Sequence, residues 1–120
     1  MKISLVMVFI LIWWHFIADF LLQSEKMALN KSKSFKWLNI HAAVYGLVIT
    51  VIGMLTIGIE RGLIFGVVNW VAHGFVDFWT SKGTSILWQK KAVHWFFCLI
   101  GFDQALHLTV LVASAAYLMQ

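Results

Sequence analysis

The sequence predicts an all-α membrane protein, an antiparallel bundle of four transmembrane helices in one domain over residues 1–120. Of the 120 residues, 62% are hydrophobic and only 12% are charged, which excludes an ordinary soluble fold. The apolar residues form four long blocks that no proline interrupts, and a helix of about 20 residues crosses the hydrocarbon core of a bilayer. We therefore expect four spans and no additional soluble domain.

The four expected spans are apolar blocks separated by short or basic segments, and they cover residues 3–22, 38–58, 62–80 and 98–119. The first block continues through Trp13 and Trp14 and lacks a small-residue cleavage site. It is therefore expected to be a transmembrane helix and not a cleaved signal peptide. Gly62 and Gly66 open the third block with small residues four apart, a pattern that brings one membrane helix close to a neighbour.

Positive charges determine the expected orientation, because lysine and arginine in short loops stay on the cytoplasmic side. The expected loops 23–37 and 81–97 contain seven lysines, whereas the opposite face has only Lys2 and Arg61. Both termini are therefore expected outside, with both basic loops in the cytoplasm. The net charge of +4 then reflects topology and contact with anionic lipid, and no nucleic-acid partner is expected.

Ionisable side chains occur inside all four expected spans, where an aspartate costs about 2.5 to 3.5 kcal/mol at the centre of a membrane helix. Most of them recur at steps of four, which places each series on one helix face. The series are His15, Asp19 and Gln23 in the first span, His41 and Tyr45 in the second, Asn69, His73 and Asp77 in the third, and Asp103 and His107, with Gln104 beside them, in the fourth. Because neighbouring spans run in opposite directions, all these positions lie toward the basic-loop side. We expect the charged groups and imidazoles to converge in one layer, about 5 to 15 Å from that side.

Four histidines and three aspartates in one low-dielectric layer favour a bound metal, because unpaired buried carboxylates would be strongly destabilising. Cys98 is the single cysteine, so the site must use imidazole and carboxylate donors, as Zn, Fe and Mn sites do. We expect one or two divalent ions of these kinds. The predicted ligands are His15, Asp19, His41, His73, Asp77, Asp103 and His107. Either Asp19 or Asp103 is expected to serve as general base in place of binding the ion, and the sequence leaves the choice open.

Two other interpretations of the same residues stay open. A histidine in a membrane helix often makes a single interhelical hydrogen bond, and a connected series of such groups can relay protons. Gln23, Tyr45, Asn69 and Gln104 are expected either to hydrogen-bond the metal ligands or to join helices directly. His94 lies outside the polar series, near Lys91, and is expected at the membrane interface.

Three motifs carry a resemblance to a known family: HFIADFLLQ at residues 15–23, HGFVD at 73–77 and FDQALH at 102–107. They resemble the small bacterial and phage membrane proteins called domain of unknown function 3307, and the resemblance covers nearly the whole chain. That family is distantly similar to inner-membrane proteins described as metal-dependent hydrolases. The resemblance implies a multi-pass protein of the bacterial cytoplasmic (inner) membrane.

The expected function is metal-dependent hydrolysis of a lipid or lipid-linked substrate near the cytoplasmic headgroups, because a bound ion activates water and polarises the bond under attack. An anionic lipid or a polyprenyl phosphate fits a site flanked by lysines. Two alternatives remain. The first is a relay or transporter for protons or divalent ions; because four helices are few for a transporter, it would require a homo-oligomer. The second is a phage-encoded interaction module with a structural metal.

Overall fold

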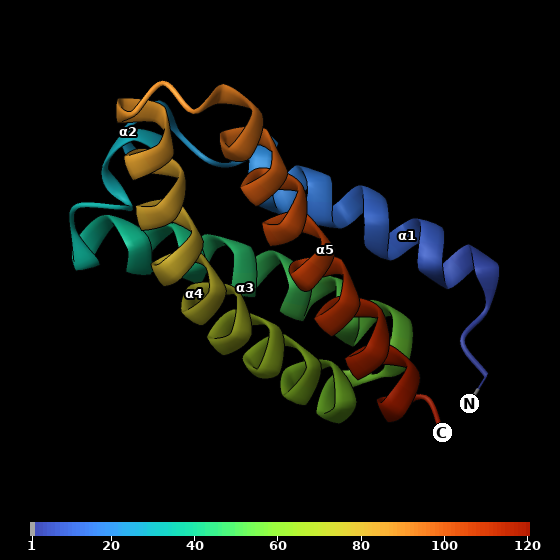
Figure 1. Cartoon of the computed structure of the whole chain (residues 1–120). Coiled ribbons are helices and arrows are strands. Elements are labelled where there is room, and N and C mark those ends of the chain that lie inside the picture. Colours follow the sequence, from blue (N-terminus) through green and yellow to red (C-terminus); the bar gives the residue numbers. More distant parts are fainter. Residues whose placement is uncertain (1) are drawn as a thin grey trace.

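The computed structural model describes residues 2–120, which fold into helices joined by short connections (Figure 1). In chain order the helices are α1 (Leu5–Phe16), the π-helix η1 (Ile17–Leu21), α2 (Glu25–Asn30), α3 (Phe35–Ile57), α4 (Ile59–Gln89) and α5 (Val93–Leu118). The described residues contain no strand, so the prediction of an all-α fold is confirmed.

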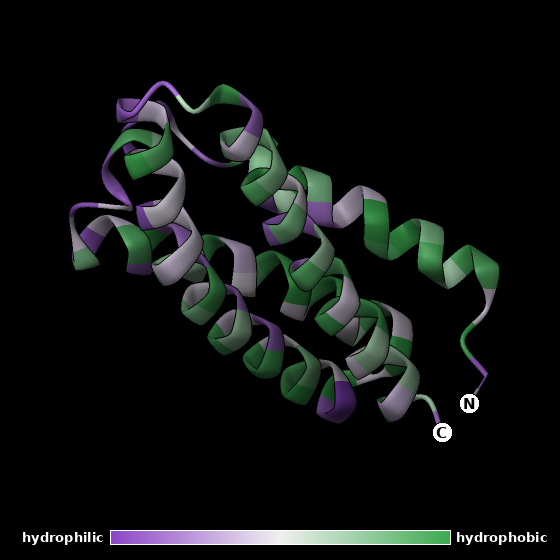
Figure 2. Cartoon of the chain, in the orientation of Figure 1, coloured by the Kyte–Doolittle hydropathy of each residue, from purple (hydrophilic) through white to green (hydrophobic). Residues whose placement is uncertain are grey.

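Three of the helices, α3, α4 and α5, are long enough and apolar enough to cross a membrane, as judged by length and composition. The expected span 3–22 corresponds to a shorter apolar helix, Leu5–Leu21, in which η1 continues α1. Hydrophilic residues gather around α2 and the turn between α4 and α5, whereas α1 is largely hydrophobic (Figure 2). The three long apolar helices indicate a multi-pass membrane protein.

The expected basic loop 81–97 is mostly helical in the structure. Helix α4 continues to Gln89 and ends in a Schellman motif, in which Ala92 N–H donates to the Leu87 carbonyl at 2.9 Å and Lys91 N–H donates to the Trp88 carbonyl at 3.0 Å. The extension is stabilised by packing, since the rings of Trp88 and Phe96 lie 5.0 Å apart between their centroids. The third expected span ends at Thr80 because the next residues, 81–85 (SKGTS), are polar.

The expected basic loop 23–37 also contains a helix. Ser24 caps α2 by accepting a hydrogen bond from the Met27 N–H at 3.2 Å, and Glu25 occupies its first turn. Both features stabilise the positive end of a helix. Helix α3 then begins at Phe35, three residues earlier than the expected span.

Helix α4 lies at the centre of the packing, with its most extensive contacts to α3 and then to α5. Gly62 and Gly66 make the close approach to α3 possible, as their spacing predicts. A Cβ atom at Gly62 would collide with the backbone of Met54, and one at Gly66 would collide with Thr50. Gly58, at φ 93°, ends α3 and lets α4 start at the next residue.

The interior is divided along the bundle axis. Both ends of the chain lie at one end of the bundle, and α2 lies at the other (Figure 1). The half nearer the termini is filled by an apolar core, whose fully buried members include Leu11, Ile49, Phe65 and Leu111. The half nearer α2 holds the predicted ligands, so the fold places the buried histidines and aspartates on one side of the apolar core.

Candidate metal centre

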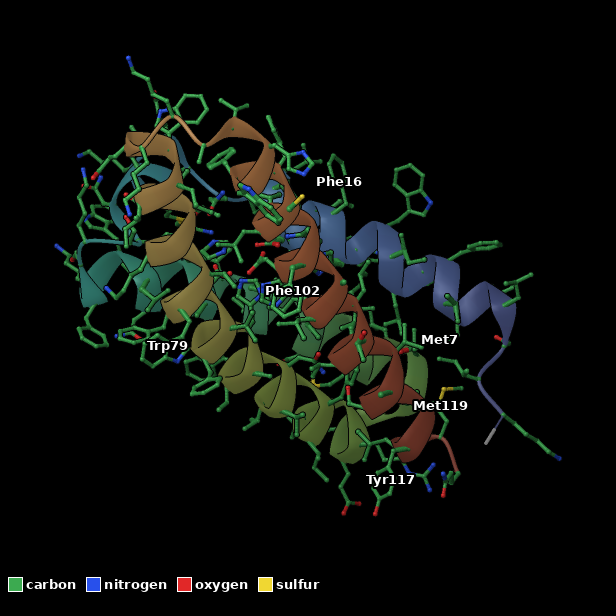
Figure 3. The ribbon with its side chains drawn as sticks, in the orientation of Figure 1. Met7, Phe16, Trp79, Phe102, Tyr117 and Met119 are labelled. Carbon is green, nitrogen blue, oxygen red and sulfur yellow. The ribbon has the colours of Figure 1, made fainter. Side chains whose placement is uncertain are left out.

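Every residue predicted as a ligand lies in one buried cluster. Side-chain nitrogen and oxygen atoms gather inside the bundle beside α5, while the labelled Trp79 lies on the outside (Figure 3). The contributing positions are His15 at the end of α1, Asp19 in η1, His41 on α3, His73 and Asp77 on α4, and Asp103 and His107 on α5. All but Asp103 are buried, and the Asp103 side chain is 14% exposed.

A π-helical turn positions Asp19. Residues Ile17–Leu21 form the π-helix η1, and the Leu22 N–H donates to the Ile17 carbonyl at 3.0 Å, five residues back. This widened turn alters the simple step of four that the sequence predicts, and such turns are frequent at functional sites. Asp19 remains near His15, with 3.6 Å between Asp19 Oδ2 and His15 Nε2.

The first donor group consists of four side-chain atoms that lie within 4.8 Å of one another, one each from Asp19, His41, His73 and Asp77. His41 Nε2 lies 3.0 Å from Asp19 Oδ1, 3.2 Å from Asp77 Oδ2 and 3.0 Å from the Nε2 of His73. His73 Nε2 lies 3.4 Å from each of the same two carboxylate oxygens. In a tetrahedral site with donors about 2.0 Å from the ion, neighbouring donors are about 3.3 Å apart. Five of the six donor separations, 3.0 to 3.4 Å, are therefore close to those of a tetrahedral site.

A second donor group adjoins the first and consists of Asp19, Asp103 and His107. His107 Nε2 lies 3.2 Å from Asp103 Oδ1 and 3.1 Å from Asp77 Oδ1. Asp77 thus directs Oδ2 toward the first group and Oδ1 toward His107, and Asp19 belongs to both groups. Carboxylates shared in this way are the arrangement expected of paired metal sites, whose ions lie about 3.5 to 4 Å apart.

Aromatic stacking holds the central imidazoles in place. The His73 ring lies between Tyr45 and His107, with centroid distances of 3.9 Å and 4.1 Å. His41 and His73 direct Nε2 toward the carboxylates, and their Nδ1 atoms are buried without a hydrogen-bond partner in the described part of the chain. The stack therefore restrains the plane of the His73 ring.

His15 lies in the cluster, yet it belongs to neither donor group. Its Nδ1 is 2.9 Å from the Tyr45 hydroxyl, and its Nε2 is 2.7 Å from Gln104 Oε1. The Gln104 amide nitrogen donates to Asp19 Oδ2 at 3.0 Å and to Asp103 Oδ2 at 3.1 Å. The Gln104 carbonyl must then accept from His15 Nε2–H, which leaves Nδ1 to accept from Tyr45. Both His15 nitrogens are engaged, so the side chain orients Gln104 and the carboxylates.

Lys31 is the main site residue that sequence reasoning missed. Its Nζ lies 3.0 Å from Asp77 Oδ2, and its side chain is 19% exposed. The residue follows α2, which turns it back toward the cluster. No local pattern distinguishes Lys31 from the other lysines of its segment, since only the folded path of α2 brings it to Asp77.

Two further polar residues of α4 differ in whether they contact the cluster. Thr80 donates its hydroxyl to Asp103 Oδ1 and so joins the cluster. Asn69 lies deeper, where it donates to Ser114 Oγ at 2.9 Å and to the Phe65 carbonyl. Asn69 therefore links α4 to α5 and does not contact the donor groups.

A cavity of about 680 Å³ adjoins the cluster on its α2 side, and Asp19, Asp77 and Asp103 form part of its wall. Lys31 and Gln104 also line it. Pockets of this size accommodate small-molecule ligands. The donor groups are thus buried in the bundle and at the same time adjacent to a space that a small molecule can enter.

Apolar helices around a buried cluster of histidine and aspartate define a class of protein: a helical, multi-pass membrane protein with two internal groups that could hold metal ions. Within this class, the chain belongs to the family described as protein of unknown function (DUF3307), which matches residues 6–120. The resemblance carried by the motifs at 15–23, 73–77 and 102–107 is therefore confirmed. No curated protein and no solved structure matches the chain.

Proposed function

We propose that this protein is a metal-dependent hydrolase of the bacterial cytoplasmic membrane that acts on a lipid or lipid-linked substrate at the cytoplasmic headgroup layer. The observation that carries the proposal is the first donor group, in which imidazole nitrogens and carboxylate oxygens from three helical segments lie 3.0 to 3.4 Å apart. We propose one or two ions of Zn, Fe or Mn, since these metals take mixed imidazole and carboxylate donors.

The proposed topology has four spans with both termini outside. At 1.5 Å per residue, Leu5–Leu21 is about 25 Å long, which is near the lower limit for a spanning helix. The two ends of the chain lie together at one end of the bundle (Figure 1), and the lysine-rich segments lie at the other. Positive residues are retained in the cytoplasm, so the metal centre would lie nearer that side.

The chemistry proposed for the site is hydrolysis. When bound, a divalent ion activates water and polarises the bond under attack. Asp103 is the better choice for general base, because it belongs to one donor group while Asp19 belongs to both. Asp103 is also more exposed than Asp19, at 14% against 5% for the side chains. Thr80 and Gln104 each donate a hydrogen bond to Asp103 and orient its carboxylate.

Transport fits the fold less well than hydrolysis does. Leu11, Ile49, Phe65 and Leu111 have no exposed surface and lie between the cluster and the terminal end of the bundle. A proton or ion path would have to cross this dry apolar core. A purely structural metal would not require the adjoining cavity.

The test of the proposed function is metal content followed by turnover. We expect the protein purified in mild detergent to retain at least about one divalent ion per chain, and His73→Ala and Asp77→Ala to lose most of it. His94→Ala is the matched control, because His94 is exposed and lies next to Cys98 and Trp95. The metal-loaded parent should hydrolyse a component of a bacterial lipid extract, followed by mass spectrometry, and a chelator should stop the reaction. A folded parent without metal would refute the proposal.

A further inference from the structure

We propose that the cavity beside the metal centre binds the phosphate-bearing head group of a membrane lipid, with the phosphate held between α4 and the segment around α2. The proposal deepens the proposed function by naming the substrate class, and it rests on that function for the chemistry that follows binding. The structural argument concerns only the walls of the cavity.

One wall is a line of hydroxyl groups on α4. Thr80, Ser81, Thr84 and Ser85 lie on a single helix face and all line the cavity. Ser81 is only 8% exposed, and its Oγ has no hydrogen-bond partner among residues 2–120. Buried polar groups are nearly always paired, and an unpaired one is costly. Phosphate oxygens accept hydrogen bonds from hydroxyl groups, so this row of donors suits a phosphate, and rotation of the Ser81 side chain toward the ligand would pair its hydroxyl.

A second unpaired polar group lies on another wall of the same cavity. Gln23 Oε1 is buried without a hydrogen-bond partner in the described residues, and Gln23 lines the cavity. The two ends of a glutamine amide are assigned from their hydrogen bonds, so the amide nitrogen can equally face the cavity as a donor. Gln23 lies in the connection between η1 and α2, whereas Ser81 is on α4, so two separate segments bring an unpaired polar group to the cavity.

Positive charge reaches the inner end of the cavity. Lys31 and Lys33 line it, and Lys31 Nζ lies 3.0 Å from Asp77 Oδ2. Lysine is a common phosphate ligand because its ammonium acts as a compact charge. Divalent ions in the two donor groups would offset the nearby carboxylates, so an anionic head group would meet net positive charge next to the metal centre.

The remaining wall is apolar, which favours a lipid over a free phosphate. Phe20, Leu29, Trp88, Phe97 and Ile100 also line the cavity, and Trp88 follows the hydroxyl groups on the same face of α4. Of these, Phe20, Trp88 and Phe97 are about half exposed on the bundle surface, so their rings connect the cavity with the surrounding lipid. A head group can therefore bind inside while its hydrocarbon chain lies along this apolar wall.

The test is binding of dioctanoyl phosphatidic acid to the purified, metal-loaded protein, measured by calorimetry. We expect Ser81→Ala and Lys31→Gln each to weaken binding about fivefold or more, with metal content unchanged in Ser81→Ala. Thr109→Ala is the matched control, since Thr109 is exposed and its hydroxyl donates to the Ala105 carbonyl of its own helix. This variant should bind the lipid as the parent does. Inorganic phosphate and dioctanoylglycerol should each bind at least about tenfold more weakly, because each lacks one of the two recognised parts.

Two outcomes would overturn the inference. If the parent, Ser81→Ala and Lys31→Gln bind the lipid equally, the cavity does not hold the phosphate. If inorganic phosphate binds as tightly as the lipid, the site serves a soluble ligand. Metal content, measured on the same samples, separates this inference from the proposed function. A metal-free parent that still binds the lipid, in a manner sensitive to Ser81→Ala, would refute the hydrolase and support the cavity assignment.

Discussion

The Nε2 atoms of His41 and His73 lie 3.0 Å apart, and both face the same two carboxylate oxygens of Asp19 and Asp77. Two N–H groups cannot point at each other over this distance, so at least one imidazole must present a lone pair to the other. A cation among the four atoms would be bound by both lone pairs and would offset both carboxylates. The His41–His73 pair is therefore the feature of this structure that most directly favours a bound metal ion.

Metal content should fall in steps with the number of donor groups that a substitution affects. Asp19 belongs to both groups and Asp103 to one. We expect Asp103→Asn to retain about half of the parent's metal and Asp19→Asn to retain less, since a carboxylate that bridges two ions serves both. Elemental analysis by mass spectrometry checks this, and equal losses in the two variants would contradict the assignment of shared ligands.

Bound metal should stabilise the fold. A ligand that binds only the native state adds about 2.7 kcal/mol at a concentration of 100 times its Kd. Chelation should therefore lower the Tm of the parent in detergent, and metal should restore it. We expect His41→Ala, whose side chain is fully buried in the cluster, to abolish the difference between chelated and metal-loaded samples. His94→Ala should preserve it.

His15 and Gln104 should act as one unit. His15 contacts the donor groups mainly through Gln104, which donates to Asp19 and Asp103. Loss of a group that orients metal ligands typically lowers metal affinity about 10- to 100-fold. We expect His15→Ala and Gln104→Leu each to fall in this range. The double variant should lose little more than either single one. Competition with a fluorescent chelator measures the affinities, and additive losses would show that His15 acts independently.

Two glycines provide a matched test of helix packing. Gly62 packs against the backbone of α3, whereas a Cβ at Gly101 would meet nothing within 4 Å. Gly62→Ala should destabilise the protein by about 1 to 3 kcal/mol, because α4 must move away from α3. Gly101→Ala should stabilise it by up to about 1 kcal/mol, because alanine favours helix over glycine. Thermal unfolding in detergent distinguishes the two, and similar shifts would mean that α3 and α4 do not pack closely.

The proposed topology can be tested with single cysteines. In a Cys98→Ala background, Lys33→Cys and Gln120→Cys lie at opposite ends of the bundle. A thiol reagent that does not cross membranes should label Gln120→Cys in intact cells and Lys33→Cys only after the membrane is opened. The reverse pattern would place the termini in the cytoplasm, in conflict with the positive-inside rule.

The helices and most of the site could be predicted from the sequence, because both depend on short-range regularities. Long apolar blocks specify membrane helices, and a step of four residues places His73 and Asp77 on one helix face. Helices that alternate in direction then bring the polar ends of all the spans to one level, which explains why His41 and His107 meet residues far away in the chain.

The tertiary structure alone determines the contacts that no local sequence pattern encodes. The turn of α2 brings Lys31 to Asp77, and the polar extension of α4 with its hydroxyl wall forms one side of the cavity. His15 shows the same limit within a predicted motif, since its role depends on Gln104, 89 positions further along the chain. Periodicity determines which face of a helix is polar, but which neighbour a side chain touches depends on how helices pack and where short connections lead the chain.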